Sequence, residues 1–173
     1  MVIKMLKESS EKTLANLKEA FAGESQANRK YLSFAAKADE EGFPQVARLF
    51  RAAADAETVH ALAHFKAMGG VKSTKENLQA AVSGETFEFK NMYPDMIQQA
   101  GADGEDEAQV SFMNANAVEQ VHAKLYQKYL DNLGSVPVSD IYVCQVCGNT
   151  VEGEAPDVCP ICGAPKSKFK KID

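Results

Sequence analysis

The chain has 173 residues, 45% of them hydrophobic and 25% charged, and it carries a net charge of −5. This length allows one sizeable core with a small appendage, but not two ordinary domains. An acidic chain lacks the concentrated positive field that nucleic-acid binding requires, so we expect no nucleic-acid partner. We find no signal peptide in residues 1–7, and no window approaches the roughly 18 apolar residues of a membrane span. We therefore expect a cytoplasmic protein with no membrane partner.

Apolar residues recur at spacings of three and four along most of the chain, which predicts helices. The first helix is expected to begin at Ser9 or Ser10, either of which can cap it, and to end at Gly42. Pro44 fits the first turn of the second helix. The long helical segments that we predict are residues 10–41, 44–68, 84–101 and 105–133. Together they predict an all-α four-helix bundle.

Shorter signals mark the connections between these segments. Ser73 and Glu76 form a capping box that opens a short helix ending near residue 82. Pro94 is expected to kink the third long segment. Helical periodicity stops after Gly134, and the rest of the chain is rich in proline, glycine and cysteine. We therefore predict a bundle in residues 1–137 and a small metal-binding domain in residues 138–173.

Two Glu-x-x-His motifs are the first candidate metal ligands. Glu57 and His60 lie midway along the second segment, and Glu119 and His122 lie midway along the fourth. Residues three apart share one helix face, so each motif offers a carboxylate and an imidazole to one point. A single motif of this kind is usually a solvated helix face. Two of them, using two of only three histidines, favour a metal site.

Two further glutamates extend this pattern. Glu24 lies 33 residues before Glu57, and Glu85 lies 34 residues before Glu119. The bundle therefore consists of two similar helix pairs, each with one Glu and one Glu-x-x-His. This is the ligand pattern of bundles that hold di-iron or di-manganese centres. Carboxylates can bridge and neutralise two cations, and without cations they would be costly in a bundle interior.

Three more side chains belong to this predicted site. Glu88 lies three residues past Glu85 and adds a seventh protein ligand that the first helix pair lacks, although a lone glutamate is more often on the surface. Tyr31 and Tyr93 follow Glu24 and Glu85 at offsets of seven and eight. They are either core aromatics or donors to the ligating carboxylates.

Four cysteines form two knuckles in the tail. Cys144 and Cys147 are followed by Gly148, and Cys159 and Cys162 by Gly163. Each glycine can adopt the left-handed conformation that turns backbone N–H groups toward sulfur. Four thiolates make a closed tetrahedral site for zinc or for a single iron, and the tail alone favours structural zinc.

In their order and spacing these motifs resemble the rubrerythrin family over almost the whole chain. The segments that carry the resemblance are residues 24–31, 57–60, 84–88, 92–94, 119–122 and the paired knuckles through Lys166. Rubrerythrins are non-haem di-iron peroxidases with a ferritin-like bundle and a rubredoxin-like tail. The resemblance therefore implies two irons in the bundle and one iron, with zinc as a possible substitute, at the four cysteines.

The resemblance also implies roles for the ligands. Glu57 and Glu119 would bridge the irons, Glu24 would be terminal on the first iron, and Glu85 with His122 terminal on the second. The first iron would move between Glu88 when oxidised and His60 when reduced. An anionic oxygen favours the ferric ion, and a neutral imidazole suits the ferrous ion.

The implied activity is reduction of hydrogen peroxide to water in oxidative-stress defence. Electrons would reach the di-iron centre one at a time through the four-cysteine iron. They would come from a rubredoxin or a reductase in a chain that is indirectly linked to NAD(P)H. Nothing in the sequence identifies this donor.

Two other functions remain open. A ferroxidase or iron-storage protein of the ferritin class would share the bundle but has no evident use for a redox-active tail. A zinc-ribbon module that binds nucleic acid or protein would not need acidic ligands that face inward. His64 shares a helix face with His60 and is expected to be structural.

The length of the chain between the second and third helices bears on assembly. A ferritin-like topology needs a crossover of about the length of the bundle, and residues 69–83 make that tight. Exchange of helices between two subunits would relieve it, in a homodimer or a tetramer. We also expect the short linker before the tail to hinder folding back onto its own bundle. The family's head-to-tail dimer would solve this difficulty.

Overall fold

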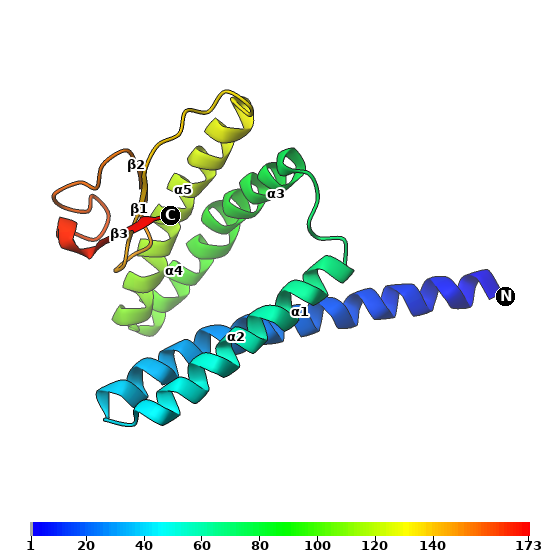
Figure 1. Ribbon diagram of the computed structural model, residues 1–173. Helices are drawn as coiled ribbons and strands as arrows, with labels where there is room; N and C mark the ends of the chain where they lie inside the picture. The colour runs from blue at the N-terminus through cyan, green and yellow to red at the C-terminus, as the bar shows by residue number, and fades with distance from the viewer. Residues whose placement is uncertain (1) are drawn as a thin grey trace. The chain divides into compact units, whose positions relative to one another are not determined.

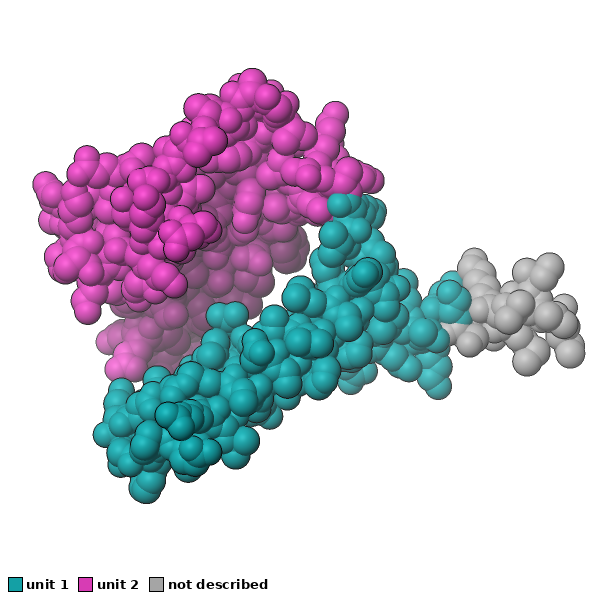
Figure 2. All heavy atoms as spheres, viewed as in Figure 1, with its two compact units in different colours: residues 1–72 teal, residues 73–173 magenta. Residues whose placement is uncertain are grey.

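The computed structural model describes residues 2–173, with side chains from residue 10 onward (Figure 1). Its elements are α1 (Val2–Glu40), α2 (Pro44–Ala67), α3 (Thr74–Phe87), the π-helical turn η1 (Glu88–Met92), α4 (Tyr93–Asp103), α5 (Asp106–Asp131), β1 (Ile141–Cys144), β2 (Thr150–Glu152), the 3-10 turn η2 (Lys166–Lys168) and β3 (Phe169–Ile172). In the described residues no helix is long and apolar enough to cross a membrane. The chain divides into two compact units, residues 1–72 and 73–173 (Figure 2).

The first unit is a hairpin of α1 and α2. Gly42 has a φ of 80°, and Phe43 donates its backbone N–H to the carbonyl of Ala38 at 2.8 Å, which closes the end of α1. Ala35, Ala38 and Ala47 are buried together against Phe50. These small side chains let the two helices approach closely. Arg51 adds an exposed ion pair to Asp39 at 2.7 Å.

The start of α1 differs from the prediction. The helix begins at Val2, so Ser9 and Ser10 lie within it. A serine is favoured as a cap but is tolerated inside a helix, and residues 4–8 are mostly good helix formers. The capping preference therefore did not decide where the helix starts.

The second unit opens as predicted with the capping box of Ser73 and Glu76. However, the expected short helix and third long segment form one continuous helical run, α3, η1 and α4. The interruption is not a break at Pro94 but a π turn just before it, in which Tyr93 donates its N–H to the carbonyl of Glu88. Because proline cannot bond to the carbonyl four residues earlier, a wider turn accommodates Pro94 without ending the helix.

The four-cysteine domain is a small antiparallel sheet with strand order β2-β1-β3. Ile141 pairs with Glu152 on one side and with Ile172 on the other. Its core is formed by Cys144, Cys159 and Ala164, with the other two cysteines, Ile161 and Phe169 packed around them. The four cysteines thus form much of the core of this domain.

This domain contacts α5 of its own chain. Lys128 and Tyr129 on α5 both donate to the carboxylate of Glu152, at 2.5 and 2.8 Å. The expectation that a short linker would hinder such folding back is therefore wrong. The chain needs to return only from Asp131 to the level of His122, about 14 Å along the helix, and the extended segment before β1 is long enough.

Candidate metal sites

The first unit brings together three of the predicted ligands. Ligand atoms of Glu24 on α1 and of Glu57 and His60 on α2 lie within 4.8 Å of one another. His60 Nδ1 is 2.8 Å from Glu57 Oε2. One turn from Glu24, the buried Asn28 donates its amide to the Ala54 carbonyl at 2.6 Å and to Thr58 Oγ1 at 2.8 Å. These bonds fix the spacing of α1 and α2 beside the cluster.

The second unit repeats this arrangement. Ligand atoms of Glu85 on α3 and of Glu119 and His122 on α5 again lie within 4.8 Å of one another. His122 Nδ1 is 2.7 Å from Glu119 Oε2 and 4.0 Å from Glu85 Oε2. Each unit therefore presents two carboxylates and one imidazole as a half-site. This donor set suits a redox-active cation such as iron.

The carboxylates of the second half-site repel one another. Burial, a side-chain hydrogen bond with Glu119, and the charges of Glu119 and Glu88 raise the pKa of Glu85 to about 7. Burial and the charge of Glu119 also raise the pKa of Glu88, while His122 lowers it. Glu88, the first residue of the π turn, therefore lies close enough to the half-site to interact with its charges. A bound cation would relieve this repulsion, so the donor set fits the implied metal.

Tyr93 and Tyr31 differ in their surroundings. Burial raises the pKa of Tyr93, and so do the charges of Glu119, Glu88 and Glu85, which places its hydroxyl in the field of the carboxylates. The ring of Tyr31 packs 6.3 Å from Phe34 and 6.1 Å from Phe50. For Tyr93 these surroundings support a donor to the candidate carboxylate ligands, and for Tyr31 they support a core aromatic.

The π turn explains why the two tyrosines have different offsets. Tyr31 lies seven residues past Glu24, which is two α-helical turns, on the same face. Tyr93 lies eight residues past Glu85, and the i→i−5 bond of the π turn accommodates the extra residue. Tyr93 therefore keeps the face of Glu85 despite the longer spacing.

The four cysteines converge in the tail. All four Sγ atoms lie within 4.8 Å of one another, and the Cys144–Cys162 and Cys147–Cys159 sulfur distances are both 3.7 Å. A tetrahedron of metal–sulfur bonds near 2.3 Å has edges of roughly 3.8 Å. The sulfurs are thus spaced for one metal ion rather than for disulfides.

The knuckle glycines adopt the predicted conformation, with φ of 87° at Gly148 and 75° at Gly163. Burial acts to raise the pKa of Cys159, but the backbone N–H groups of Cys162 and Ile161 bring it down to about 7. Sulfurs that accept backbone N–H groups in this way are prepared to bind a metal as thiolates. This geometry suits zinc and iron equally.

Sequence reasoning missed Tyr126 and Thr150. Burial and the charges of Glu85 and Glu119 raise the pKa of Tyr126, so it belongs to the surroundings of the second half-site. It lies seven residues past Glu119, the offset that separates Tyr31 from Glu24, and this repeat could have revealed it. His64 stands at the same offset from Glu57. Thr150 contacts His122, but it lies 28 residues away and carries no local signal.

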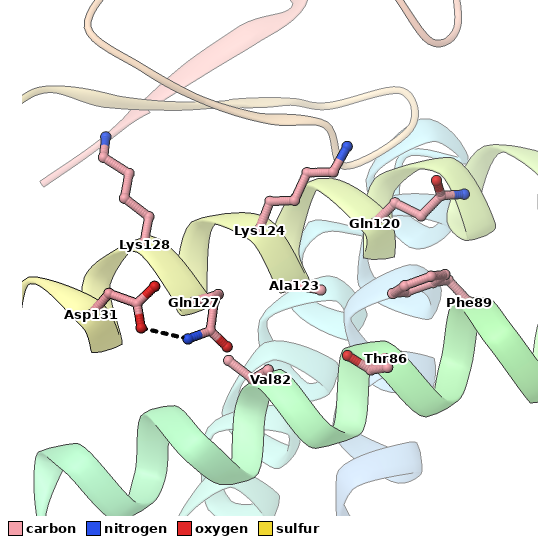
Figure 3. Close-up of a pocket in the computed structure, with 9 residues that line it drawn as sticks. All are labelled: Val82, Thr86, Phe89, Gln120, Ala123, Lys124, Gln127, Lys128 and Asp131. Carbon is pink, nitrogen blue, oxygen red and sulfur yellow. Dashed lines mark hydrogen bonds between the residues drawn. The ribbon is translucent and has the colours of Figure 1, made fainter.

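A groove of about 530 Å³ in the second unit is a different feature (Figure 3). Val82, Thr86 and Phe89 line one side, and α5 residues including Lys124 and Gln127 line the other. Gln127 donates to Asp131 at 2.7 Å along α5. None of the nine lining residues is a candidate ligand, so this groove does not mark the candidate metal site.

The helices, half-sites and four-cysteine tail define a di-metal carboxylate protein with a rubredoxin-like domain. The family named "Rubrerythrin" matches residues 15–130, and "Rubrerythrin, rubredoxin-like domain" matches residues 142–170. The chain belongs to the rubrerythrin family. The ferritin-like fold class and the resemblance seen in the sequence are confirmed, and the family implies a di-iron centre and an iron site with four cysteines.

Individual relatives support this assignment. Rubrerythrin-2 of Clostridium acetobutylicum is 36% identical, covering 89% of this chain and 93% of its own. Nigerythrin of Nitratidesulfovibrio vulgaris is 34% identical, covering 91% and 85%. A nigerythrin structure in a mixed-valence state matches with a TM-score of 0.56 and 35% identity, covering 92% of this chain and 86% of that chain. A fully reduced, all-ferrous nigerythrin structure has a TM-score of 0.58 with 34% identity.

Proposed function

We propose that this protein is a peroxidase that reduces hydrogen peroxide to two waters at a di-iron centre, with electrons supplied through the four-cysteine iron. When bound, the iron pair would supply two electrons to the peroxide and stabilise the charge that develops on oxygen. The observation that carries the proposal is the coexistence, in one chain, of two Glu-Glu-His half-sites and a tetrahedral cluster of sulfurs. An oxidoreductase needs both a reaction site and an electron entry, and these clusters provide one of each.

Each candidate ligand would have its own role in holding the two metals. Glu57 and Glu119 would bridge the two metals, and Glu24, Glu85 and His122 would hold their outer positions. His60 and Glu88 would exchange at the first metal, as the family pattern implies. Glu88 supports this exchange because it lies in a π turn, where helices often carry functional residues. Tyr93 would donate to the carboxylates and hold them in place.

The electron donor is proposed to be a rubredoxin or a reductase fed by NAD(P)H. The four-cysteine site requires a donor that can transfer one electron at a time, because a four-thiolate iron changes its oxidation state in one-electron steps. The domain boundary at residue 138 remains a prediction, and we propose that the tail acts as the electron-receiving domain.

We further propose that the di-iron centre is completed by a second copy of the chain. Only six residues, 68–73, join α2 to α3, and they extend over about 25 Å at most between Ala67 and Thr74. Glu57 lies about 15 Å before the end of α2, and Glu85 lies about 16 Å past the start of α3. In a ferritin-like topology these helices run parallel, so the connection would have to span about 31 Å to bring both glutamates to one level. Helix exchange in a homodimer removes this requirement.

The proposed function is tested with protein purified without oxygen. We expect about three irons per chain, a visible iron–thiolate absorption band, and steady consumption of peroxide with a one-electron donor. Glu57→Gln combined with Glu119→Gln should remove the bundle iron and the turnover while leaving the thiolate band, so this double variant is the matched control. Accumulation of a mineral core without turnover would support the storage class instead. A colourless tail and salt-dependent binding to a polynucleotide would support the zinc ribbon.

A further inference from the structure

His122 has a contact at each of its ring nitrogens, one on the side of the half-site carboxylates and one with the four-cysteine domain. Its Nδ1 lies 2.7 Å from Glu119 Oε2, on the side of the carboxylates. Its Nε2 lies 2.9 Å from the hydroxyl oxygen of Thr150, the first residue of β2. This hydrogen bond joins the helical half-site to the four-cysteine domain of the same chain.

The Thr150 hydroxyl has a defined direction. It donates to the Gly148 carbonyl at 3.2 Å. A hydroxyl that donates to this carbonyl accepts from the Nε2–H of His122, at 2.9 Å. Nδ1 then offers its lone pair on the carboxylate side once a bound cation has displaced the proton that joins it to Glu119 Oε2 at 2.7 Å. Thr150 thus favours the tautomer of His122 that can act as a ligand there.

A series of hydrogen bonds leads on from Thr150 to a cysteine sulfur. The Gly148 carbonyl belongs to the peptide group whose N–H is that of Asn149, and this N–H is hydrogen-bonded to Cys147 sulfur. Three hydrogen bonds, at His122, Thr150 and Asn149, therefore connect an imidazole of the half-site to a sulfur of the tail. The path crosses only one peptide group.

Apolar side chains flank part of this path. A pocket of about 240 Å³ that includes His122 and Thr150 is lined in part by Leu78, Leu125 and Ile141. Gly148 itself lies against α5, since a Cβ on this glycine would be 3.7 Å from Val118.

We propose that Thr150 is a positioning residue that fixes His122 for metal binding and couples the four-cysteine site to the half-site on α5 of the same chain. This inference rests on the proposed di-iron centre. In each transfer along the path, one electron leaves the ferrous four-cysteine site and reduces one ferric ion of the pair, and no bond is made or broken. An external one-electron donor then restores the four-cysteine site.

The test uses full-length protein with three substitutions. Thr150→Val keeps the shape and removes the hydroxyl, Thr150→Ser keeps the hydroxyl, and Thr13→Val changes an exposed threonine on α1 as a control. The first measurement is an anaerobic titration of ferrous iron into chains whose four-cysteine site is already loaded. We expect affinity at the helical site to fall on the order of ten-fold in Thr150→Val and to be near wild type in the other two.

The second measurement mixes fully reduced protein with one equivalent of peroxide and follows the ferric–thiolate band. We expect this band to appear about ten-fold more slowly in Thr150→Val, with an unchanged spectrum that shows an intact four-cysteine site. Wild-type affinity and rate in Thr150→Val, or equal losses in the valine and serine variants, would overturn the inference. If wild-type protein does not react with peroxide, the proposed activity fails, and the titration alone still decides the role of Thr150.

Discussion

Carboxylate oxygens of Glu85 on α3 and Glu119 on α5 lie within 4.8 Å of each other, and burial together with the neighbouring Glu119 carboxylate raises the pKa of Glu85 to about 7. Burial and a nearby like charge both favour the protonated form of a carboxyl group. A metal that binds near neutral pH must therefore displace a proton from part of the metal-free population.

This relationship predicts the pH dependence of the metal-free protein. The pKa of Glu85 is raised from 4.5 to about 7, so the folded chain binds more protons than the unfolded chain between these values. Its stabilising contribution is present below pH 4.5 and is lost as the pH rises through about 7. We expect Glu85→Gln to flatten this decline, by less than about 1 kcal/mol because solvent screens a partly exposed group.

The measurement is urea unfolding at pH 5 and pH 7.5 in the presence of a chelator. Glu19→Gln, on an exposed part of α1, is the matched control and should keep the wild-type dependence. An equal decline in Glu85→Gln and wild type would show that protonation of Glu85 does not contribute to stability.

The four-cysteine site predicts a separable loss of metal. Cys144→Ser removes a buried ligand, so we expect each chain to lose about one iron and the thiolate band while keeping the bundle iron. A single addition of peroxide should still oxidise the reduced bundle, but turnover with an external donor should stop. Metal analysis and stopped-flow absorption check both points. Undiminished turnover would mean that electrons enter elsewhere.

If helices are exchanged between subunits, two chains that are each inactive should restore activity when they form a heterodimer. One chain carries Glu57→Gln and the other Glu119→Gln, and their heterodimer is isolated with two different tags. If helices are exchanged, one centre receives both substitutions and the other receives none, so iron and peroxidase activity should return to about half of the wild-type values. If each chain builds its own centre, both centres are damaged and nothing is restored. The two homodimers serve as controls.

Glu152 contributes to the contact between the tail and α5, in addition to the hydrogen bond between Thr150 and His122. Hydrogen bonds from Lys128 and then Tyr129 lower the pKa of the Glu152 carboxyl. The contact is therefore fully formed above the ordinary pKa of a glutamate, and it weakens as the pH falls through the lowered pKa. We expect Glu152→Gln to weaken docking by about 0.5–1 kcal/mol, seen as faster hydrogen exchange in β2 at neutral pH. Glu154→Gln breaks only the Lys166 pair within the tail and should leave this exchange unchanged.

The features that the sequence predicted well are those that depend on the spacing of residues close together in the chain. The Glu-x-x-His motifs imply a shared helix face, and the structure accordingly brings Glu57 to His60 and Glu119 to His122. The capping box at Ser73 and the left-handed glycines after each cysteine pair are also local, and both are confirmed.

Features that depend on long-range packing escaped prediction. Thr150 meets His122 only because β2 folds back onto α5, and no pattern around either residue encodes that approach. The π turn was visible only indirectly, as an offset of eight where the other helix pair has seven. The start of α1 was missed because a serine cap is a preference, and the helix-forming residues before it outweighed that preference.

The π turn has a further consequence for how the two halves of the chain can differ. In a regular α-helix one inserted residue rotates everything downstream by about 100°, which would carry Tyr93 away from the carboxylates. Here the insertion is absorbed within Glu88–Met92, so α4 stays in phase with α5. The second unit thus accommodates one more residue than the first between its glutamate and its tyrosine, and this π turn begins at Glu88, the candidate ligand that has no counterpart in the first unit.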